Sequence, residues 1–328
     1  MMNTPQIAFL TPVAKKTADE LYRLLPNGFE LKIANQNDRE EHRELLKEAH
    51  YAFLGGTHLD ADLIQSAPKL KLIQKWGIGV DKIDLIAAKD RGVPVAITNG
   101  ANASQVAEHA ILLMLATLRK LPYARQSLID GQWINSELRV SCSQLVGKTV
   151  GIFGLGNIAK HVIKQLRGFD TPVIYYTRTR LSTAEEARLN IQYVDFKTLL
   201  QQSDILSLHA PLTDATKNII NAENLALMKK DAIIINTARG ELIDEDALVN
   251  AIQTKNLRGA GLDVFANEPP NPDNPLLKLD GVVATPHAGA SVIEAVISVI
   301  EHGMNNIANF EKGIPLDPAD WIVRPPAV

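Results

Sequence analysis

The sequence has little of what several protein classes require. Its one cysteine, Cys142, has no partner for an internal disulfide and belongs to no cluster that could hold a metal ion. Its longest charge-free apolar run, residues 110–118, is far shorter than the ~18 residues of a membrane-spanning helix. The chain start lacks the basic residues and apolar core of a secretion signal, and a formal net charge of −3 offers no basic face for nucleic acid. We therefore expect a cytoplasmic protein with no metal and with neither a nucleic-acid nor a membrane partner.

What is present is the composition of an ordinary globular protein, with 46% hydrophobic and 22% charged residues. A length of 328 residues favours about two domains. Short apolar runs alternate with longer amphipathic segments such as residues 14–25 and 38–49, which predicts an α/β fold with mostly parallel sheets covered on both faces. The predicted strands are residues 6–10, 29–34, 51–55, 70–76, 93–97, 149–153, 173–176, 204–208, 232–236 and 259–264.

The strand and helix pattern forms two series, which predicts two Rossmann-like domains. Between the series lies a predicted helix over residues 104–119, with Ser104 as its N-cap. This helix is apolar on nearly every side, so we expect it to be buried, between domains or between subunits. A last helix over residues 291–310 follows the second series and can pack back on the first domain. The first domain is then discontinuous and flavodoxin-like, with residues 1–101 and 291–328, and the second covers residues 102–290.

A glycine-rich turn follows the predicted strand at residues 149–153. Gly154 permits a tight turn, Gly156 lets a pyrophosphate approach the backbone, and the small Ala159 lets the next helix pack on the strand. The start of that helix, at Asn157 and Ile158, directs free N–H groups at the phosphates. The turn predicts a dinucleotide site, and the alternative is a tight strand-to-helix turn without a ligand.

The next strand ends without the acidic residue that usually binds the ribose 2′-hydroxyl of NAD. Thr177, Arg178, Thr179 and Arg180 stand there instead. Two guanidinium groups suit a 2′-phosphate, because each can form bidentate, charge-assisted hydrogen bonds. The sequence therefore predicts a preference for NADP(H), with NAD(H) also possible. The alternative is that both arginines are solvated loop charges.

Three later segments each place a polar side chain near a strand end: residues 236–240, 262–269 and 285–287. Together with the early turn at residues 77–81, these motifs closely resemble the D-isomer-specific 2-hydroxyacid dehydrogenase family. The resemblance covers nearly the whole chain and is closest to glyoxylate and hydroxypyruvate reductases. It implies an NAD(P)-dependent enzyme whose first domain binds the substrate and whose second binds the dinucleotide.

The resemblance implies three catalytic residues. Arg239 would bind the substrate carboxylate and carbonyl oxygen, His287 would be the general acid and base, and Glu268 would pair with His287. The chemistry agrees, because reduction of a keto acid needs a proton donor near neutral pH, and a neighbouring carboxylate orients an imidazole. Taken singly, a histidine before a helix and a glutamate before proline are more often structural.

Further contacts are implied by the same resemblance. The backbone at Ile78 and Gly79 would bind the substrate carboxylate, the alternative being a simple turn. Asp263 would lie near the nicotinamide amide, and His109 is interpreted as structural. The complete predicted cofactor set is Val106, Gly154, Gly156, Asn157, Ile158, Thr177, Arg178, Arg180, His209, Pro211, Thr216, Thr237, Ala238, Asp263, His287 and Gly289.

The expected substrate is a small unphosphorylated 2-keto acid. Phosphoglycerate dehydrogenases of this family usually carry an Arg-Ser pair where this chain has Gly55, Gly56 and Thr57, which favours glyoxylate or hydroxypyruvate. We also expect no regulatory domain after residue 310. The alternatives are a phosphoglycerate dehydrogenase or a nucleotide-sensing interaction protein like the family's corepressors. A homodimer is expected, as for other family members.

Overall fold

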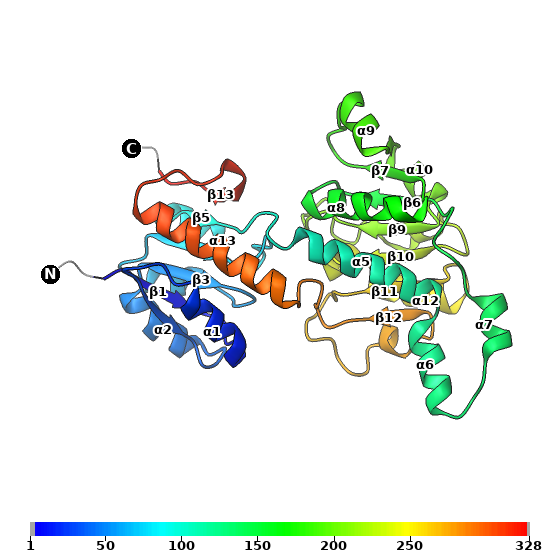
Figure 1. Cartoon of the computed structure of the whole chain (residues 1–328), viewed down its shortest axis with the longest axis horizontal. Helices are drawn as coiled ribbons and strands as arrows, with labels where there is room; N and C mark the ends of the chain where they lie inside the picture. Colours follow the sequence, from blue (N-terminus) through cyan, green and yellow to red (C-terminus); the bar gives the residue numbers. More distant parts are fainter. Residues whose placement is uncertain (1–3, 327–328) are drawn as a thin grey trace. The chain divides into compact units, whose positions relative to one another are not determined.

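The chain forms two compact units, and the computed structural model describes residues 4–326 (Figure 1). One unit comprises residues 1–102 together with 291–328, and the other comprises residues 103–290. The predicted domain border after residue 101 lies one residue from the border between these units. That the first unit binds the substrate stays a prediction.

The sheet of the first unit has the strand order β13-β5-β4-β3-β1-β2. All neighbouring strands are parallel except β13 and β5. Without β13, the order is that of flavodoxin-like folds, which confirms the predicted fold class. The sequence pattern did not predict β13, because three residues are too few to show an alternation. The strands are β1 (Gln6–Phe9), β2 (Glu30–Ile33), β3 (Tyr51–Leu54), β4 (Leu72–Lys75), β5 (Val95–Ala96) and β13 (Trp321–Val323).

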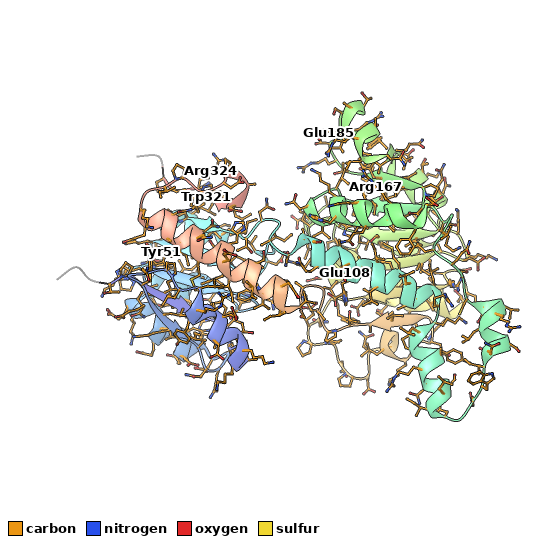
Figure 2. All side chains as sticks on the ribbon, in the orientation of Figure 1. Tyr51, Glu108, Arg167, Glu185, Trp321 and Arg324 are labelled. Carbon is orange, nitrogen blue, oxygen red and sulfur yellow. The ribbon has the colours of Figure 1, made fainter. Side chains whose placement is uncertain are left out.

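Helices cover both faces of this first sheet. They are α1 (Lys15–Arg23), α2 (Arg39–Glu48), α3 (Ala61–Gln65), α4 (Leu85–Asp90) and α13 (Ile293–Glu311). Successive side chains of a strand point to opposite faces, so Ile7 and Phe9 of β1 pack with α1 and α13, whereas Ala8 packs with α2, α3 and α4. Figure 2 labels Tyr51 and Trp321, which belong to the core under α13. Helix α13 thus completes the first unit from the later part of the chain, as predicted.

The sheet of the second unit is wholly parallel, with the order β12-β11-β10-β9-β6-β7-β8. Two strands, β8 and β12, were not predicted from the sequence. The direction in which strands are added reverses between β6 and β9, as in a Rossmann-like fold. The strands are β6 (Val150–Phe153), β7 (Val173–Tyr176), β8 (Gln192–Tyr193), β9 (Ile205–Leu208), β10 (Ile233–Asn236), β11 (Gly259–Leu262) and β12 (Val282–Ala284).

Helices cover both faces of the second sheet as well. Helices α5 and α8 lie on one face, and α10, α11 and α12 lie on the other. Helices α6 and α7 extend away from the sheet (Figure 1). The bounds are α5 (Ala103–Leu118), α6 (Leu121–Ile129), α7 (Asn135–Ser141), α8 (Asn157–Leu166), α9 (Thr183–Leu189), α10 (Phe196–Gln202), α11 (Ala222–Leu225) and α12 (Glu245–Gln253), with 3-10 turns at Arg167–Phe169, Gly240–Leu242, Pro275–Lys278 and Pro318–Asp320.

Helix α5 is buried, as predicted, but elements of its own unit bury it. One side packs on α8 and another on the sheet, where a Cβ added at Gly261 would lie 2.9 Å from the Cβ of Leu113. The apolar residues on both sides of α5 are therefore covered by elements of the same unit, and their burial requires no second domain or subunit. The prediction of Ser104 as N-cap is wrong, because the helix already begins at the buried Ala103. None of the helices between residues 4 and 326 is long and apolar enough to span a bilayer.

Candidate functional site

Most residues predicted to form the site follow the carboxyl ends of parallel strands in the second unit. Strands β6, β9, β10, β11 and β12 are neighbours in the sheet and run in one direction, so the segments that follow them lie at one edge. The reversal between β6 and β9 is the position where doubly wound sheets bind ligands. The segments contain residues 154–158, 209–216, 237–239, 263–268 and 287–289.

The glycine turn after β6 has the geometry that a dinucleotide requires. Gly154 has a φ of +87°, and a Cβ added there would lie 2.6 Å from the backbone nitrogen of Ala210. Gly156 is the N-cap of α8, and a Cβ added there would meet nothing within 4 Å. Ala159 is fully buried against the sheet. The first N–H groups of α8, at Asn157 and Ile158, thus begin beside open space, which fits a bound pyrophosphate.

The loop after β9 holds the predicted residues His209, Pro211 and Thr216. The hydroxyl of Ser207 lies 2.8 Å from Nε2 of His209, and burial lowers the pKa of His209 to about 4. This ring is therefore neutral at neutral pH. The hydroxyl of Thr216 donates to the carbonyl of Pro211 at 2.7 Å and accepts from the backbone of Thr213 at 2.8 Å. Thr216 thereby fixes the loop beside the glycine turn.

The two arginines after β7 differ in their surroundings. Arg180 donates from Nε and Nη2 to the carboxylate of Glu186, at 2.7 and 2.8 Å, and lies over the ring of Tyr193. Glu186 also accepts from the hydroxyl of Tyr175, and Arg180 and Tyr175 lower its pKa to about 2. Arg178 is exposed, and no partner for it exists among residues 4–326. Arg180 is thus already paired, whereas Arg178 is available to a ligand.

The turn after β10 carries Arg239 and is rigidly held. The buried side chain of Asn236 donates to the carbonyl of Arg239 at 2.8 Å and accepts from the backbone of Ala238 at 3.0 Å. A Cβ added at Gly240 would lie 1.9 Å from the backbone carbon of Phe265, so only glycine lets this turn lie against the loop after β11. The hydroxyl of Thr237 is buried without a hydrogen-bond partner among the described residues, which leaves it free for a ligand.

The structure brings Glu268 and His287 into contact. Nδ1 of His287 lies 2.8 Å from Oε2 of Glu268, and 55% of the His287 side chain is exposed. Oε1 of Glu268 accepts from the backbone nitrogen of Phe265 at 3.3 Å. Because Nδ1 of His287 faces the Glu268 carboxylate, Nε2 is left for a substrate.

Asp263 binds the backbone of the segment that carries His287. Its carboxylate accepts from the backbone nitrogens of Ala288 at 2.7 Å and Gly289 at 2.8 Å. Burial alone raises the pKa of Asp263, but hydrogen bonds from His109, Thr285 and these backbone groups outweigh it and lower the pKa. A Cβ added at Gly289 would lie 3.6 Å from the side chain of Val106 on α5. The predicted residues Val106, Asp263 and Gly289 are therefore neighbours.

The predicted substrate loop belongs to the first unit. Ile78 and Gly79 follow β4; the side chain of Ile78 is exposed, whereas Val80 packs against the core of the unit. Gly77 has a φ of +89° and donates its N–H to the hydroxyl of Thr98 at 2.8 Å. The carbonyl of Gly77 accepts from the backbone nitrogen of Thr98 at 3.1 Å. Thr98 thus holds the turn at the end of the strand.

Sequence reasoning missed residues that support the site. Glu245, in the first turn of α12, accepts from the backbone of Ala266 at 2.7 Å and from the side chain of Asn274 at 3.0 Å. It therefore fixes the loop that carries Glu268. An acidic residue at a helix start usually indicates a favourable helix-dipole interaction, so this role left no distinct signal. Within residues 4–326, no group of histidine, cysteine and acidic side chains has the arrangement of a metal site.

Comparisons with known proteins show which family the chain resembles. Residues 111–289 match the family described as "D-isomer specific 2-hydroxyacid dehydrogenase, NAD binding domain". A D-3-phosphoglycerate dehydrogenase of Archaeoglobus fulgidus is 39% identical over 306 residues, covering 93% of this chain and 57% of that protein. A hydroxypyruvate reductase of Thermotoga maritima is 42% identical over 280 residues, covering 84% and 90% respectively. A solved glyoxylate reductase from Paecilomyes thermophila has a TM-score of 0.84 and 30% identity, covering 98% of this chain and 99% of that one.

We predict that alanine at Gly154 lowers the stability of the fold, whereas alanine at Gly156 lowers the affinity for the dinucleotide. Gly154→Ala places a side chain at positive φ and against Ala210, so we expect unfolding to become easier by at least about 1–2 kcal/mol. Gly156→Ala meets nothing in the protein, so stability stays unchanged while affinity for NADPH and NADH falls about tenfold or more. Thermal unfolding and cofactor fluorescence titration measure the two effects. Unchanged cofactor affinity in Gly156→Ala contradicts the placement of the pyrophosphate.

Proposed function

The chain belongs to the D-isomer-specific 2-hydroxyacid dehydrogenase family, and we propose that it reduces glyoxylate or hydroxypyruvate to the D-2-hydroxy acid with NADPH. The contact between His287 and Glu268, at the same sheet edge as the glycine turn, is the observation that carries this proposal. It provides an oriented proton donor where a dinucleotide fits. Arg239, at the same edge, provides the charge that a 2-keto acid needs.

The dinucleotide would be held by the glycine turn, by the start of α8 and by the free hydroxyl of Thr237. When bound, the reduced nicotinamide supplies a hydride to the carbonyl carbon of the substrate. His287 gives the proton from Nε2 to the carbonyl oxygen, so the C=O bond becomes CH–OH. Glu268 keeps Nδ1 occupied, which fixes the ring with Nε2 toward the substrate.

Arg239 binds the substrate carboxylate in this proposal. A guanidinium matches the two carboxylate oxygens with parallel N–H groups and also polarises the adjacent carbonyl. Asn236 holds the backbone of the Arg239 turn, and Nη1 of Arg239 donates to the carbonyl of Ala238 at 2.6 Å.

A small unphosphorylated substrate fits the first unit better than a phosphorylated one. Gly55, Gly56 and Thr57 directly after β3 carry no charged side chain. The hydroxyl of Thr57 is buried, donates to the carbonyl of Leu10 at 2.9 Å and lies 2.8 Å from the hydroxyl of Thr11. These side chains complete one another's hydrogen bonds and leave none for a phosphate. 3-Phosphohydroxypyruvate is nevertheless the alternative to test, given the similarity to phosphoglycerate dehydrogenases.

The first experiment follows oxidation of NADPH and, separately, NADH by the purified chain with glyoxylate, hydroxypyruvate or 3-phosphohydroxypyruvate. We expect turnover of NADPH with the two small acids. Arg239→Lys should lower kcat/KM about 100-fold, because an ammonium replaces a bidentate fork with a point charge. Preference for the phosphorylated acid would identify a phosphoglycerate dehydrogenase. Cofactor binding without turnover on any 2-keto acid would favour a nucleotide-sensing interaction protein.

We propose that Arg178 provides the main contact with the 2′-phosphate of NADP(H). Arg178 is exposed and available, whereas Glu186 already occupies two donor groups of Arg180. Arg180 also connects the loop to α9 through Glu186 and covers the ring of Tyr193. It therefore shapes the loop and contributes its positive charge only in part. The hydroxyl of Thr177 is the neighbouring neutral donor.

Arginine variants test this division of roles. We expect Arg178→Ala to lower kcat/KM with NADPH about tenfold or more, with little change for NADH, because only NADPH carries the 2′-phosphate. Arg180→Ala should have a smaller effect on the ratio of the two. Arg188→Ala removes an exposed charge from α9 and is the matched control. A wild-type preference for NADH, or an unchanged ratio in Arg178→Ala, contradicts the proposed cofactor preference.

We propose that the protein is a homodimer. Helices α6 and α7 and their connection expose large apolar side chains, which single soluble units usually bury. These are Leu121, Leu128, Ile129, Trp133 and Val140, with exposures between 56% and 87%. We expect sedimentation velocity to give the mass of two chains and Trp133→Glu to give that of one, because a buried charge opposes the contact. A monomeric wild-type protein contradicts this proposal.

A further inference from the structure

The backbone at His287 adopts a conformation that few residues other than glycine accept. Its φ is +51°, in the left-handed region, and the side chain leaves this position toward Glu268. Such a conformation persists only where surrounding groups determine it. Glu268 binds the ring and therefore orients the side chain. Another group must hold the backbone.

Asp263 holds that backbone at consecutive residues. Its carbonyl oxygen accepts from the nitrogen of His287 at 2.8 Å. Its Oδ1 accepts from the nitrogen of Ala288 at 2.7 Å, and its Oδ2 from that of Gly289 at 2.8 Å. Three successive N–H groups are therefore bound by one residue. The position of Asp263 sets the position of the His287 backbone.

A hydrogen-bonded chain from α5 orients the Asp263 carboxylate, which is only 2% exposed. The hydroxyl of Thr285 donates to Oδ1 of Asp263 at 2.6 Å. A hydroxyl has one proton, so Thr285 must accept in its contact with Nε2 of His109 at 2.9 Å. The same Nε2 lies 3.3 Å from Oδ1 of Asp263. His109 therefore carries a proton on Nε2 and donates it to the hydroxyl oxygen of Thr285 and to Oδ1 of Asp263.

We propose that His109 and Thr285 are positioning residues for the reaction, acting through the Asp263 carboxylate to place the proton donor His287. The inference rests on the proposed function of His287. It assigns a role to His109, which the sequence alone indicated to be structural. Glu268 orients the ring of His287, and the chain from His109 through Thr285 fixes the backbone beneath it.

The network also couples the proton donor to the dinucleotide. Oδ1 of Asp263 accepts from Thr285 and Ala288 and shares the proton of His109 with Thr285, whereas within residues 4–326 Oδ2 binds only the nitrogen of Gly289. A carboxylate oxygen has about two acceptor positions, so Oδ2 keeps one for the nicotinamide amide. One carboxylate thereby positions both reacting groups. Its tilt, controlled by Thr285 and His109, changes their separation.

Variants of Thr285 test this inference. Thr285→Val keeps the shape and removes the hydroxyl, so we expect kcat to fall about tenfold or more, with KM for NADPH changed less than about threefold. Thr285→Ser restores the hydroxyl and should recover most of kcat. Thr117→Val on α5 is the matched control, because its buried hydroxyl has no hydrogen-bond partner within the described residues. We expect that control to keep wild-type kcat.

His109 provides a second, independent pair of variants should Thr285→Val fail to fold. His109→Leu removes the donor, whereas His109→Gln supplies an amide N–H near the position of Nε2. We expect a loss of kcat in the first and substantial recovery in the second, with both melting within a few degrees of the wild type. Wild-type kcat in both Thr285→Val and His109→Leu overturns the inference. An inactive wild-type chain instead contradicts the proposed function of His287 on which the inference rests.

Discussion

Strands β6, β9, β10, β11 and β12 run in one direction, so their carboxyl ends present five neighbouring segments at one edge of the second sheet. Apolar cores on both faces fix these strands, because each strand packs side chains alternately against α5 and α8 or against α10 to α12. Backbone N–H and C=O groups just beyond the strand ends have no hydrogen-bond partner on a neighbouring strand and need partners elsewhere. Asn236 and Asp263 supply them, so the same side chains that satisfy the strand ends also fix the segments of the site.

Much of this framework is visible in the sequence. The central strands are apolar runs such as residues 232–236, whose isoleucines suit a strand buried on both faces. Strands β8 and β13 are too short to show a pattern, and β12 has three residues between a glycine and a threonine. His287 was therefore found through its motif, while the strand that positions it was not. The N-cap of α5 was misplaced because a favourable hydroxyl need not mark where packing starts the helix.

The catalytic candidates were predictable, but their supporting partners were not. Motif order identified Arg239, Glu268 and His287, and the structure adds the contact between the last two. His109 and Thr285 are 176 residues apart, and only the packing of α5 across the sheet brings their side chains together. The partner of Arg180 was likewise not predictable from the sequence, because its pairing with Glu186 depends on how the chain turns into α9. Local sequence identifies a charge, whereas its availability depends on the tertiary neighbour.

The left-handed backbone at His287 explains why carboxylates on two sides are needed. If only the ring were held, the backbone would relax toward common φ values and carry Nε2 away; if only the backbone were held, the ring would rotate about its side-chain bonds. Glu268 and Asp263 remove these two freedoms separately, and both come from the segment after β11. The segment after β11 therefore determines the geometry of His287, the proposed proton donor, more directly than the segment that contains it. In the proposed mechanism, the remaining acceptor position on Asp263 extends that control to the nicotinamide, so hydride and proton donors share one reference point.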